Sequence, residues 1–274
     1  MKYSIITVNY NNRDGLKRTI ESVIFQTFKD YEFIIIDGGS TDGSVEVIQY
    51  YAEYITYWVS EPDKGIYNAM NKGIQAAHGD YLSFMNSGDL FYQADVLQQS
   101  VPYLGTDIVQ GMNYNEAQHK IEFRPDYAAS MRFLYEASLS HQACFIRRTL
   151  FNDCPYREDY RLVSDWIFFV EQLIFRNCTF RNIPVIVVRF DGTGASEDKQ
   201  AVRDEQQRVF ANLLPPRILS DYEHFKGRDS RLLILTPLFN RTYRLEKFIF
   251  SVVRAILWVY YRIFKHNTSI NIPR

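Results

Sequence analysis

SEPDKGIYNAMNKGIQAAHGDYLSFMNSGD, residues 60–89, contains the pattern that decides the fold. A polar turn that includes Asp63 leads into a helical pattern over 65–77, and an apolar strand over 80–86 then leads into a turn that ends at Asp89. The two aspartates therefore bracket one helix and one strand. Strands that alternate with helices in this way are typical of parallel sheets covered by helices.

The same alternation extends back to the start of the chain. Hydrophobic periodicity predicts further strands and helices, in the order strand 3–9, helix 14–27, strand 31–36, helix 43–53 and strand 55–59. The sequence therefore predicts an α/β fold with a mostly parallel sheet flanked by helices.

Three carboxylates follow successive strands of this predicted sheet. Asp37, Asp63 and Asp89 are spaced 26 residues apart, and each comes just after a strand. The carboxyl ends of parallel strands form the rim where ligands bind, so the three side chains are expected on one rim. Any one of them alone is also an ordinary turn residue. As a set they would repel one another unless a cation lies among them, and a divalent metal is the usual solution.

Composition and charge limit the function classes. The chain has 274 residues, of which 46% are hydrophobic and 16% aromatic, enough for one large α/β domain with an appendage. A formal net charge of −1 argues against a nucleic-acid-binding surface. The charge is uneven, because residues 231–274 contain eight basic residues and one acidic residue, a net +7, and the remainder of the chain carries −8.

The three cysteines, Cys144, Cys154 and Cys178, lack CxxC spacing. Neither a zinc site nor a disulfide framework is indicated, so a reducing compartment is expected. The first residues form a predicted strand rather than a signal peptide, which favours a cytoplasmic location.

Three segments carry a family resemblance: SIITVNYNN at 4–12, IIIDGGSTDGS at 34–44, and residues 60–89. In order and spacing they resemble the N-terminal half of a family 2 glycosyltransferase of the GT-A fold, similar to bacterial exopolysaccharide transferases of the colanic-acid type. The resemblance covers residues 3 to 190. It implies a nucleotide-sugar site whose base lies near Thr7, Asn9 and Tyr10, with Asp37 accepting from the imino NH of the base and Asp63 nearby.

The resemblance also implies that Asp89 holds Mn²⁺ or Mg²⁺ on the diphosphate. Here the chain departs from the family, which commonly has an acidic DxDD-like string where this sequence has NSGD, residues 86–89. Asn86 retains an amide that can bond a ribose hydroxyl. Met70 stands where many relatives have arginine, which leaves Lys64 and Asn71 as the polar candidates at that position.

The second half of the chain is expected to supply the acceptor side. Asp165 begins an apolar helical pattern that ends near Phe175, and an acid in a first helical turn can be merely stabilising. The Ser-Asp-Trp at 164–166 nevertheless resembles the family element whose second acid is the catalytic base of inverting members. His141 is either a hydrogen-bonded structural residue or a substrate ligand. Residues 191–199 read either as a flap over the donor or as a surface loop.

The basic tail forms a separate predicted unit. Residues 248–265 are apolar but interrupted by two arginines, which argues against a membrane span. On a helix, one narrow stripe is formed by residues spaced three or four apart, namely Ser251, Arg254, Trp258, Arg262 and Lys265, with apolar residues around the rest. This pattern suits a helix lying on an anionic membrane surface, and the alternative is a helix packed on the catalytic domain or on a second copy. The sequence predicts a transferase domain over 1–228, with a donor half at 1–112 and an acceptor half at 113–228, and a tail over 229–274.

The expected function is a metal-assisted, inverting glycosyltransferase on the inner face of the cell membrane. It would pass a hexose from a UDP-sugar to a glycan or lipid-linked acceptor of a surface polysaccharide, with Asp165 taking the acceptor proton. A sugar-phosphate nucleotidyltransferase would need a glycine-rich phosphate loop where NNRDGLKR, residues 11–18, stands. A degenerate sugar-nucleotide-binding or scaffold protein would explain NSGD but not the presence of Asp165. Monomer and homo-oligomer both stay open.

Overall fold

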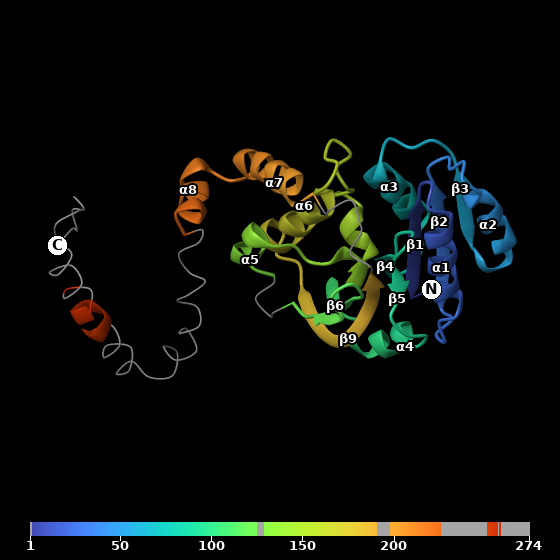
Figure 1. Ribbon diagram of the computed structural model, residues 1–274, viewed down its shortest axis with the longest axis horizontal. Helices are drawn as coiled ribbons and strands as arrows, with labels where there is room; N and C mark the ends of the chain where they lie inside the picture. The colour runs from blue at the N-terminus through green and yellow to red at the C-terminus, as the bar shows by residue number, and fades with distance from the viewer. Residues whose placement is uncertain (1, 125–128, 191–197, 226–250, 257, 259–274) are drawn as a thin grey trace. The chain divides into compact units, whose positions relative to one another are not determined.

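The computed structural model describes residues 2–124, 129–190, 198–225, 251–256 and 258 (Figure 1). The chain divides into two units, Met1–Leu214 and Pro215–Arg274. The predicted domain boundary after residue 228 lies outside the described residues and stays a prediction.

The described part of the first unit contains a nine-stranded sheet in the order β3-β2-β1-β4-β8-β6-β9-β5, with β7 paired to β6. Its strands are β1 (Tyr3–Asn9), β2 (Tyr31–Asp37), β3 (Tyr57–Ser60), β4 (Tyr81–Phe84), β5 (Leu90–Phe91), β6 (Ile108–Asn115), β7 (Lys120–Glu122), β8 (Cys144–Arg147) and β9 (Phe180–Phe190).

The helices of the first unit are α1 (Arg13–Ile24), α2 (Ser44–Tyr50), α3 (Ile66–Ala76), α4 (Val96–Ser100), α5 (Met131–Glu136), α6 (Ser164–Val170) and α7 (Lys199–Leu213). Shorter turns of helix are η1 (Ala52–Tyr54), η2 (Val101–Tyr103), η4 (His141–Ala143), η5 (Arg148–Phe151) and the π-helical η6 (Glu171–Phe175). The second unit contains α8 (Pro216–Phe225).

The strand β1 is buried along its whole length because helices cover both faces of the sheet. Ile5 and Phe33 lie in the core cluster that includes Leu16 of α1, whereas Ile6 faces α3 on the opposite side. A Cβ atom on Gly73 of α3 would lie 2.5 Å from Cγ2 of Ile6, so glycine permits this close approach. Alternate residues of one strand therefore pack into two apolar layers, one on each face of the sheet, as expected when helices cover both faces.

The predicted α/β architecture is confirmed, with parallel pairing from β3 through β2 and β1 to β4. Beyond β4 the sheet is mixed, because β8 runs antiparallel to both β4 and β6, and β9 runs parallel to β6. The strand-and-helix repeat that predicts parallel strands ends at β4. The next strand in the sheet, β8, comes from the second half of the chain and runs antiparallel to β4. The donor half is therefore the regular part of the fold.

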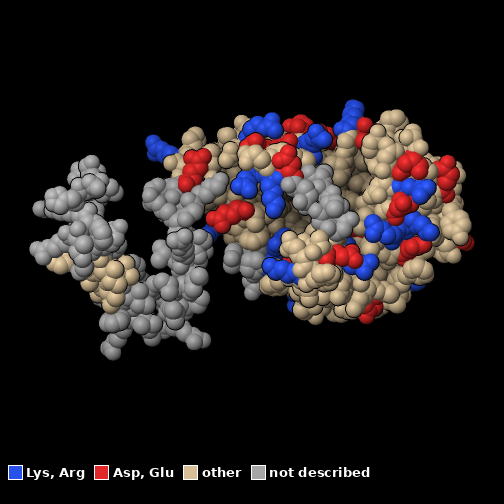
Figure 2. All heavy atoms as spheres, viewed as in Figure 1, with Lys and Arg blue, Asp and Glu red and all other residues tan. Residues whose placement is uncertain are grey.

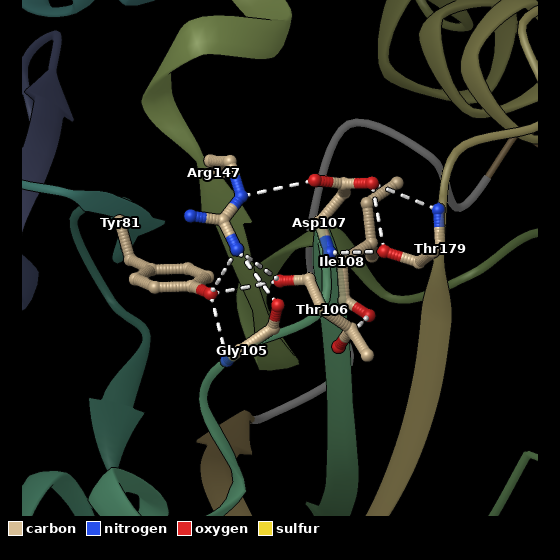
Figure 3. A network of polar contacts seen from close by, with 7 residues as sticks. All are labelled: Tyr81, Gly105, Thr106, Asp107, Ile108, Arg147 and Thr179. Carbon is tan, nitrogen blue, oxygen red and sulfur yellow. Dashed lines mark hydrogen bonds and ion pairs between the residues drawn. The ribbon is translucent and has the colours of Figure 1, made fainter.

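A polar network joins four strands at the end of the sheet where β4 begins (Figure 3). Arg147 of β8 donates from Nε to Oδ1 of Asp107 at 2.9 Å and from Nη2 to the hydroxyl of Tyr81 at 3.0 Å. The other oxygen of Asp107 accepts from the backbone and the hydroxyl of Thr179, at 2.9 and 2.7 Å. This network holds β8 beside β4 and β6, and it lies at the opposite end of β4 from residues 86–89.

The surface of the described residues carries both charges. On the face shown in Figure 2, lysine and arginine side chains are interspersed with aspartate and glutamate. No helix in the described part of the chain is both long enough and apolar enough to cross a membrane. Of the predicted tail helix, residues 251–256 and 258 are helical with exposed side chains, and its other positions lie outside the described residues.

Candidate active site

The residues expected near the base of a donor lie where β1 ends. Thr7 is buried and donates from Oγ1 to the backbone oxygen of Met85 at 2.7 Å. Asn9 is buried and donates from Nδ2 to Oδ1 of Asp37 at 2.7 Å. Tyr10, the next residue, leaves the sheet with 67% of its surface exposed. Thr7 and Asn9 therefore hold neighbouring strands together, and Tyr10 offers its ring to solvent.

Asp37, at the end of β2, is fully buried and accepts five hydrogen bonds. Asn9 and the hydroxyl of Ser40 donate to Oδ1, and the backbone of Gly39, the backbone of Ser40 and the hydroxyl of Ser60 donate to Oδ2. Burial alone would raise the pKa of the carboxyl, but these hydrogen bonds outweigh it and hold the pKa below its usual value. In this structure Asp37 organises the loop after β2, and its predicted bond to a base stays a prediction.

Asp63 and Tyr10 flank the backbone of Gly38. A Cβ atom on Gly38 would lie 2.5 Å from Oδ2 of Asp63 and 3.2 Å from Cδ2 of Tyr10. Oδ1 of Asp63 accepts from the backbone of Gly65 at 2.8 Å. Lys64 is exposed, and its backbone donates to Oδ1 of Asn68 at 3.2 Å. An exposed aromatic ring and a carboxylate thus lie together beyond β1 and β2, where a base could stack.

Asn71, on α3, binds other parts of the protein through both ends of its amide. Its Nδ2 donates to the backbone oxygen of Tyr156 at 2.8 Å and to Oε1 of Glu158 at 2.9 Å, and its Oδ1 accepts from the backbone of Tyr156 at 3.0 Å. The side chain therefore anchors the segment that precedes α6. Its predicted contact with a donor remains untested.

A chain of hydrogen-bonded side chains connects Asp165, the predicted catalytic base, to the loop after β4. The hydroxyl of Tyr67 on α3 donates to Oδ1 of Asp165 at 2.7 Å, and Oδ2 of Asp165 lies 3.0 Å from Nδ1 of His141. Nε2 of His141 lies 3.3 Å from Nδ2 of Asn86. The structure thus brings together three of the residues singled out from the sequence and adds Tyr67, which sequence reasoning missed.

Electrostatics couples Asp165 to His141. Burial opposes the charge on each, but their mutual hydrogen bond and attraction outweigh it, lowering the pKa of Asp165 and raising that of His141. Burial and the charge of Asp165 also raise the pKa of Tyr67, so its hydroxyl stays protonated as a donor. The pair can accept one proton and keep the resulting imidazolium next to a carboxylate.

The loop that carries Asp89 is fixed by Thr19 of α1. The hydroxyl of Thr19 accepts from the backbone of Gly88 at 2.9 Å and donates to the backbone oxygen of Asp89 at 2.8 Å. Gly88 has a φ of +109°, a conformation that glycine adopts without strain. Like Tyr67, Thr19 contacts a predicted site residue and was not identified from the sequence.

No group of three or more metal-ligating side chains occurs among the described residues. This does not disqualify Asp89, because Mg²⁺ and Mn²⁺ on nucleotides commonly use one or two carboxylates, and phosphates and waters supply the rest. A carboxylate beyond the end of β4 fits that donor set. Of the predicted flap at 191–199, residues 191–197 lie outside the described residues.

Comparisons with known proteins agree with this geometry. Residues 4–155 match the model of glycosyl transferase family 2. Over 198 residues the chain is 30% identical to a PGL/p-HBAD biosynthesis glycosyltransferase of Mycobacterium bovis, covering 70% of this chain and 77% of that protein. It is 32% identical over 224 residues to an uncharacterized glycosyltransferase of Mycobacterium tuberculosis, covering 77% of this chain and 80% of that protein.

Solved structures show the same GT-A fold. S. aureus TarS 1–349 in complex with UDP-GlcNAc aligns with a TM-score of 0.60 and 16% identity, covering 90% of this chain and 77% of that one. The chain spans only 46% of a longer TarS structure, with a TM-score of 0.61 and 18% identity. The mannosyltransferase PcManGT from Pyrobaculum calidifontis, in complex with GDP-Man and Mn²⁺, aligns with a TM-score of 0.57 and 14% identity, covering 97% of this chain and 88% of that one.

Proposed function

Because the chain belongs to glycosyl transferase family 2, we propose that it moves a hexose from a UDP-sugar to a hydroxyl of a glycan or lipid-linked saccharide, with inversion at the anomeric carbon. The observation that carries this proposal is the hydrogen-bonded chain from Tyr67 through Asp165 and His141 to Asn86. It joins a proton-accepting pair to the loop beyond β4, where a donor diphosphate is expected.

In the proposed donor site, Tyr10 and Asp63 meet the base beside Gly38, with Lys64 exposed close by. Thr7, Asn9 and Asp37 fix the strand ends that shape this site, and Asn71 anchors the acceptor-side segment to α3. Asn86 has a buried Oδ1 without a hydrogen-bond partner, an acceptor available to a hydroxyl of the donor or of the acceptor.

The proposed reaction is a single displacement. The acceptor oxygen attacks the anomeric carbon from the face opposite the diphosphate, the bond to the diphosphate oxygen breaks, and that oxygen leaves with the electron pair. The acceptor proton passes to the pair formed by Asp165 and His141. Inversion follows because the incoming and departing oxygens occupy opposite faces of the sugar.

Asp89 is the residue proposed to hold Mn²⁺ or Mg²⁺. When bound, such an ion neutralises charge on the departing diphosphate. The mannosyltransferase PcManGT, which aligns with this fold, was solved with Mn²⁺. That structure supports a divalent metal here but does not identify which metal this chain would bind.

The basic tail supports a proposed place of action at the inner face of the cell membrane. Its net charge of +7 over residues 231–274 suits an anionic lipid surface, where a lipid-linked acceptor of surface polysaccharide synthesis would be met. The relative from Mycobacterium bovis is named as a PGL/p-HBAD biosynthesis glycosyltransferase.

The stereochemistry of donor hydrolysis tests the proposal without knowledge of the acceptor. Water replaces the acceptor, and the sugar released from an α-linked UDP-hexose is followed by proton NMR at early times, before its anomers equilibrate. An inverting enzyme releases the β-anomer first. Initial release of the α-anomer would contradict the proposed displacement.

A further inference from the structure

Asp165 already uses both carboxylate oxygens. Oδ1 accepts from Tyr67 at 2.7 Å, and Oδ2 is bound to Nδ1 of His141 at 3.0 Å. The side chains of His141 and Asp165 are 14% and 15% exposed, so burial does not distinguish them. Nε2 of His141 lies at the other end of this hydrogen-bonded chain, next to Asn86 in the loop after β4, where a donor diphosphate is expected.

The contact with Asp165 places a proton on Nδ1 of His141. An ionised carboxylate can only accept, so Nδ1 must donate to Asp165. Nε2 lies 3.3 Å from Nδ2 of Asn86 and can accept from that nitrogen. One neutral tautomer satisfies both contacts, with the proton on Nδ1 and the lone pair of Nε2 directed toward the loop at 86–89.

We propose that His141, through Nε2, is the group that takes the proton from the acceptor hydroxyl, and that Asp165 and Tyr67 position it. This inference rests on the proposed function and names the receiving atom. As the acceptor oxygen bonds to the anomeric carbon, its proton moves to Nε2 in place of the weak 3.3 Å contact with Asn86. The nucleoside diphosphate leaves with the electron pair of the broken bond, and Asp165 stabilises the imidazolium that results.

The surroundings of His141 support this assignment. The charged groups that act on the ring are Asp165 on α6 and Asp89 in the loop after β4, and the ring of Phe84 packs at 6.4 Å between centroids. Burial opposes a charge on the ring, but the hydrogen bond and the charge of Asp165 outweigh it and raise the pKa of His141, so Asp165 stabilises the imidazolium that forms when the ring accepts a proton.

Three substitutions separate this role from a structural one. His141→Asn keeps an amide NH near the position of Nδ1, so it can still bond Asp165, but it removes Nε2. His141→Gln places a non-basic amide near Nε2. Asp165→Asn presents an amide NH to Nδ1 and so forces the ring proton onto Nε2, which can then no longer accept. His78→Gln is the matched control, because the side chain of His78 is 75% exposed and lies in the connection between α3 and β4.

The assay measures UDP release by hydrolysis of the UDP-hexose that the unchanged protein cleaves fastest, together with the affinity for UDP in the presence of Mn²⁺. We expect His141→Asn, His141→Gln and Asp165→Asn each to slow hydrolysis by at least about 100-fold, with UDP affinity and melting temperature nearly unchanged. The double variant of His141 and Asp165 should be no slower than either single one, since the two act as a unit.

Three outcomes would overturn the inference. If hydrolysis is lost in Asp165→Asn but retained in both His141 variants, Asp165 takes the proton directly. If the His141 variants lose Mn²⁺-dependent UDP affinity, His141 is a ligand of the metal rather than the base. If the unchanged protein hydrolyses none of the UDP-, GDP- or dTDP-sugars offered, the proposed function fails, and this inference fails with it.

Discussion

Replacing Asp37 by alanine is expected to destabilise the fold, and not only to weaken nucleotide binding. Two donors to the Asp37 carboxylate, the backbone amides of Gly39 and Ser40, cannot rotate toward water, whereas Nδ2 of Asn9 also donates to Oγ of Ser40. A partly buried donor left without a partner costs at least about 1 kcal/mol. The expected loss in the free energy of unfolding is therefore about 2 kcal/mol, a large part of the ~5–15 kcal/mol typical of a folded domain.

Guanidinium titration at pH 7, followed by circular dichroism, measures this loss as a lower transition midpoint with an unchanged slope. Asp63→Ala is the matched control, because one hydrogen bond is seen at that carboxylate, from the backbone of Gly65. Its expected cost is about 1 kcal/mol or less. If Asp37→Ala instead unfolded at the same midpoint as the unchanged protein and lost its affinity for UDP, the loop-organising role would be wrong and the bond to the base would be supported.

Three further changes test other parts of the account. Asp89→Asn should weaken UDP binding at least about tenfold in the presence of Mn²⁺ and leave binding in EDTA unchanged, and equal Mn²⁺-dependent affinity in isothermal titration calorimetry would remove its metal role. A chain ending at Arg228 should lose its affinity for anionic liposomes in a co-sedimentation assay, whereas equal binding before and after truncation would favour the packed-helix alternative. Hydrogen bonds from Ser4, His78 and Gly79 outweigh burial and lower the pKa of Glu32, so its stabilising contribution is present at pH 7 and is lost as the pH falls below about 4. The difference in unfolding free energy between the unchanged protein and Glu32→Gln should shrink over that range, and a constant difference would argue against the lowered pKa.

Local sequence pattern was sufficient for the regular half of the fold. The helix predicted over 65–77 is observed at Ile66–Ala76, and the first predicted strand coincides with β1. Hydrophobic periodicity and turn residues are local signals, so they indicate elements well where a strand and a helix repeat. The antiparallel strands beyond β4 carry no such signal, because their pairing depends on partners far along the chain.

Side-chain roles were harder to predict than backbone elements. Tyr67 is 98 residues from its partner Asp165, and Thr19 is 70 residues from Asp89, so neither contact is visible in a local motif. Asn71 was singled out because of its place in a family pattern. In the structure, both the nitrogen and the oxygen of its amide form hydrogen bonds with the segment at 156–158. Whether a polar side chain faces a ligand or another segment is decided by tertiary packing.

A donor panel provides the decisive test of the nucleotide-sugar site. The purified protein is incubated with UDP-, GDP- and dTDP-hexoses in the presence of Mn²⁺, and thermal unfolding and slow release of the free sugar are followed for each. The account predicts that a UDP-hexose raises the melting temperature in a concentration-dependent manner, as selective binding to the folded state requires, and is slowly hydrolysed. If no sugar nucleotide in the panel either stabilised the protein or was hydrolysed, the chain would not be the transferase proposed.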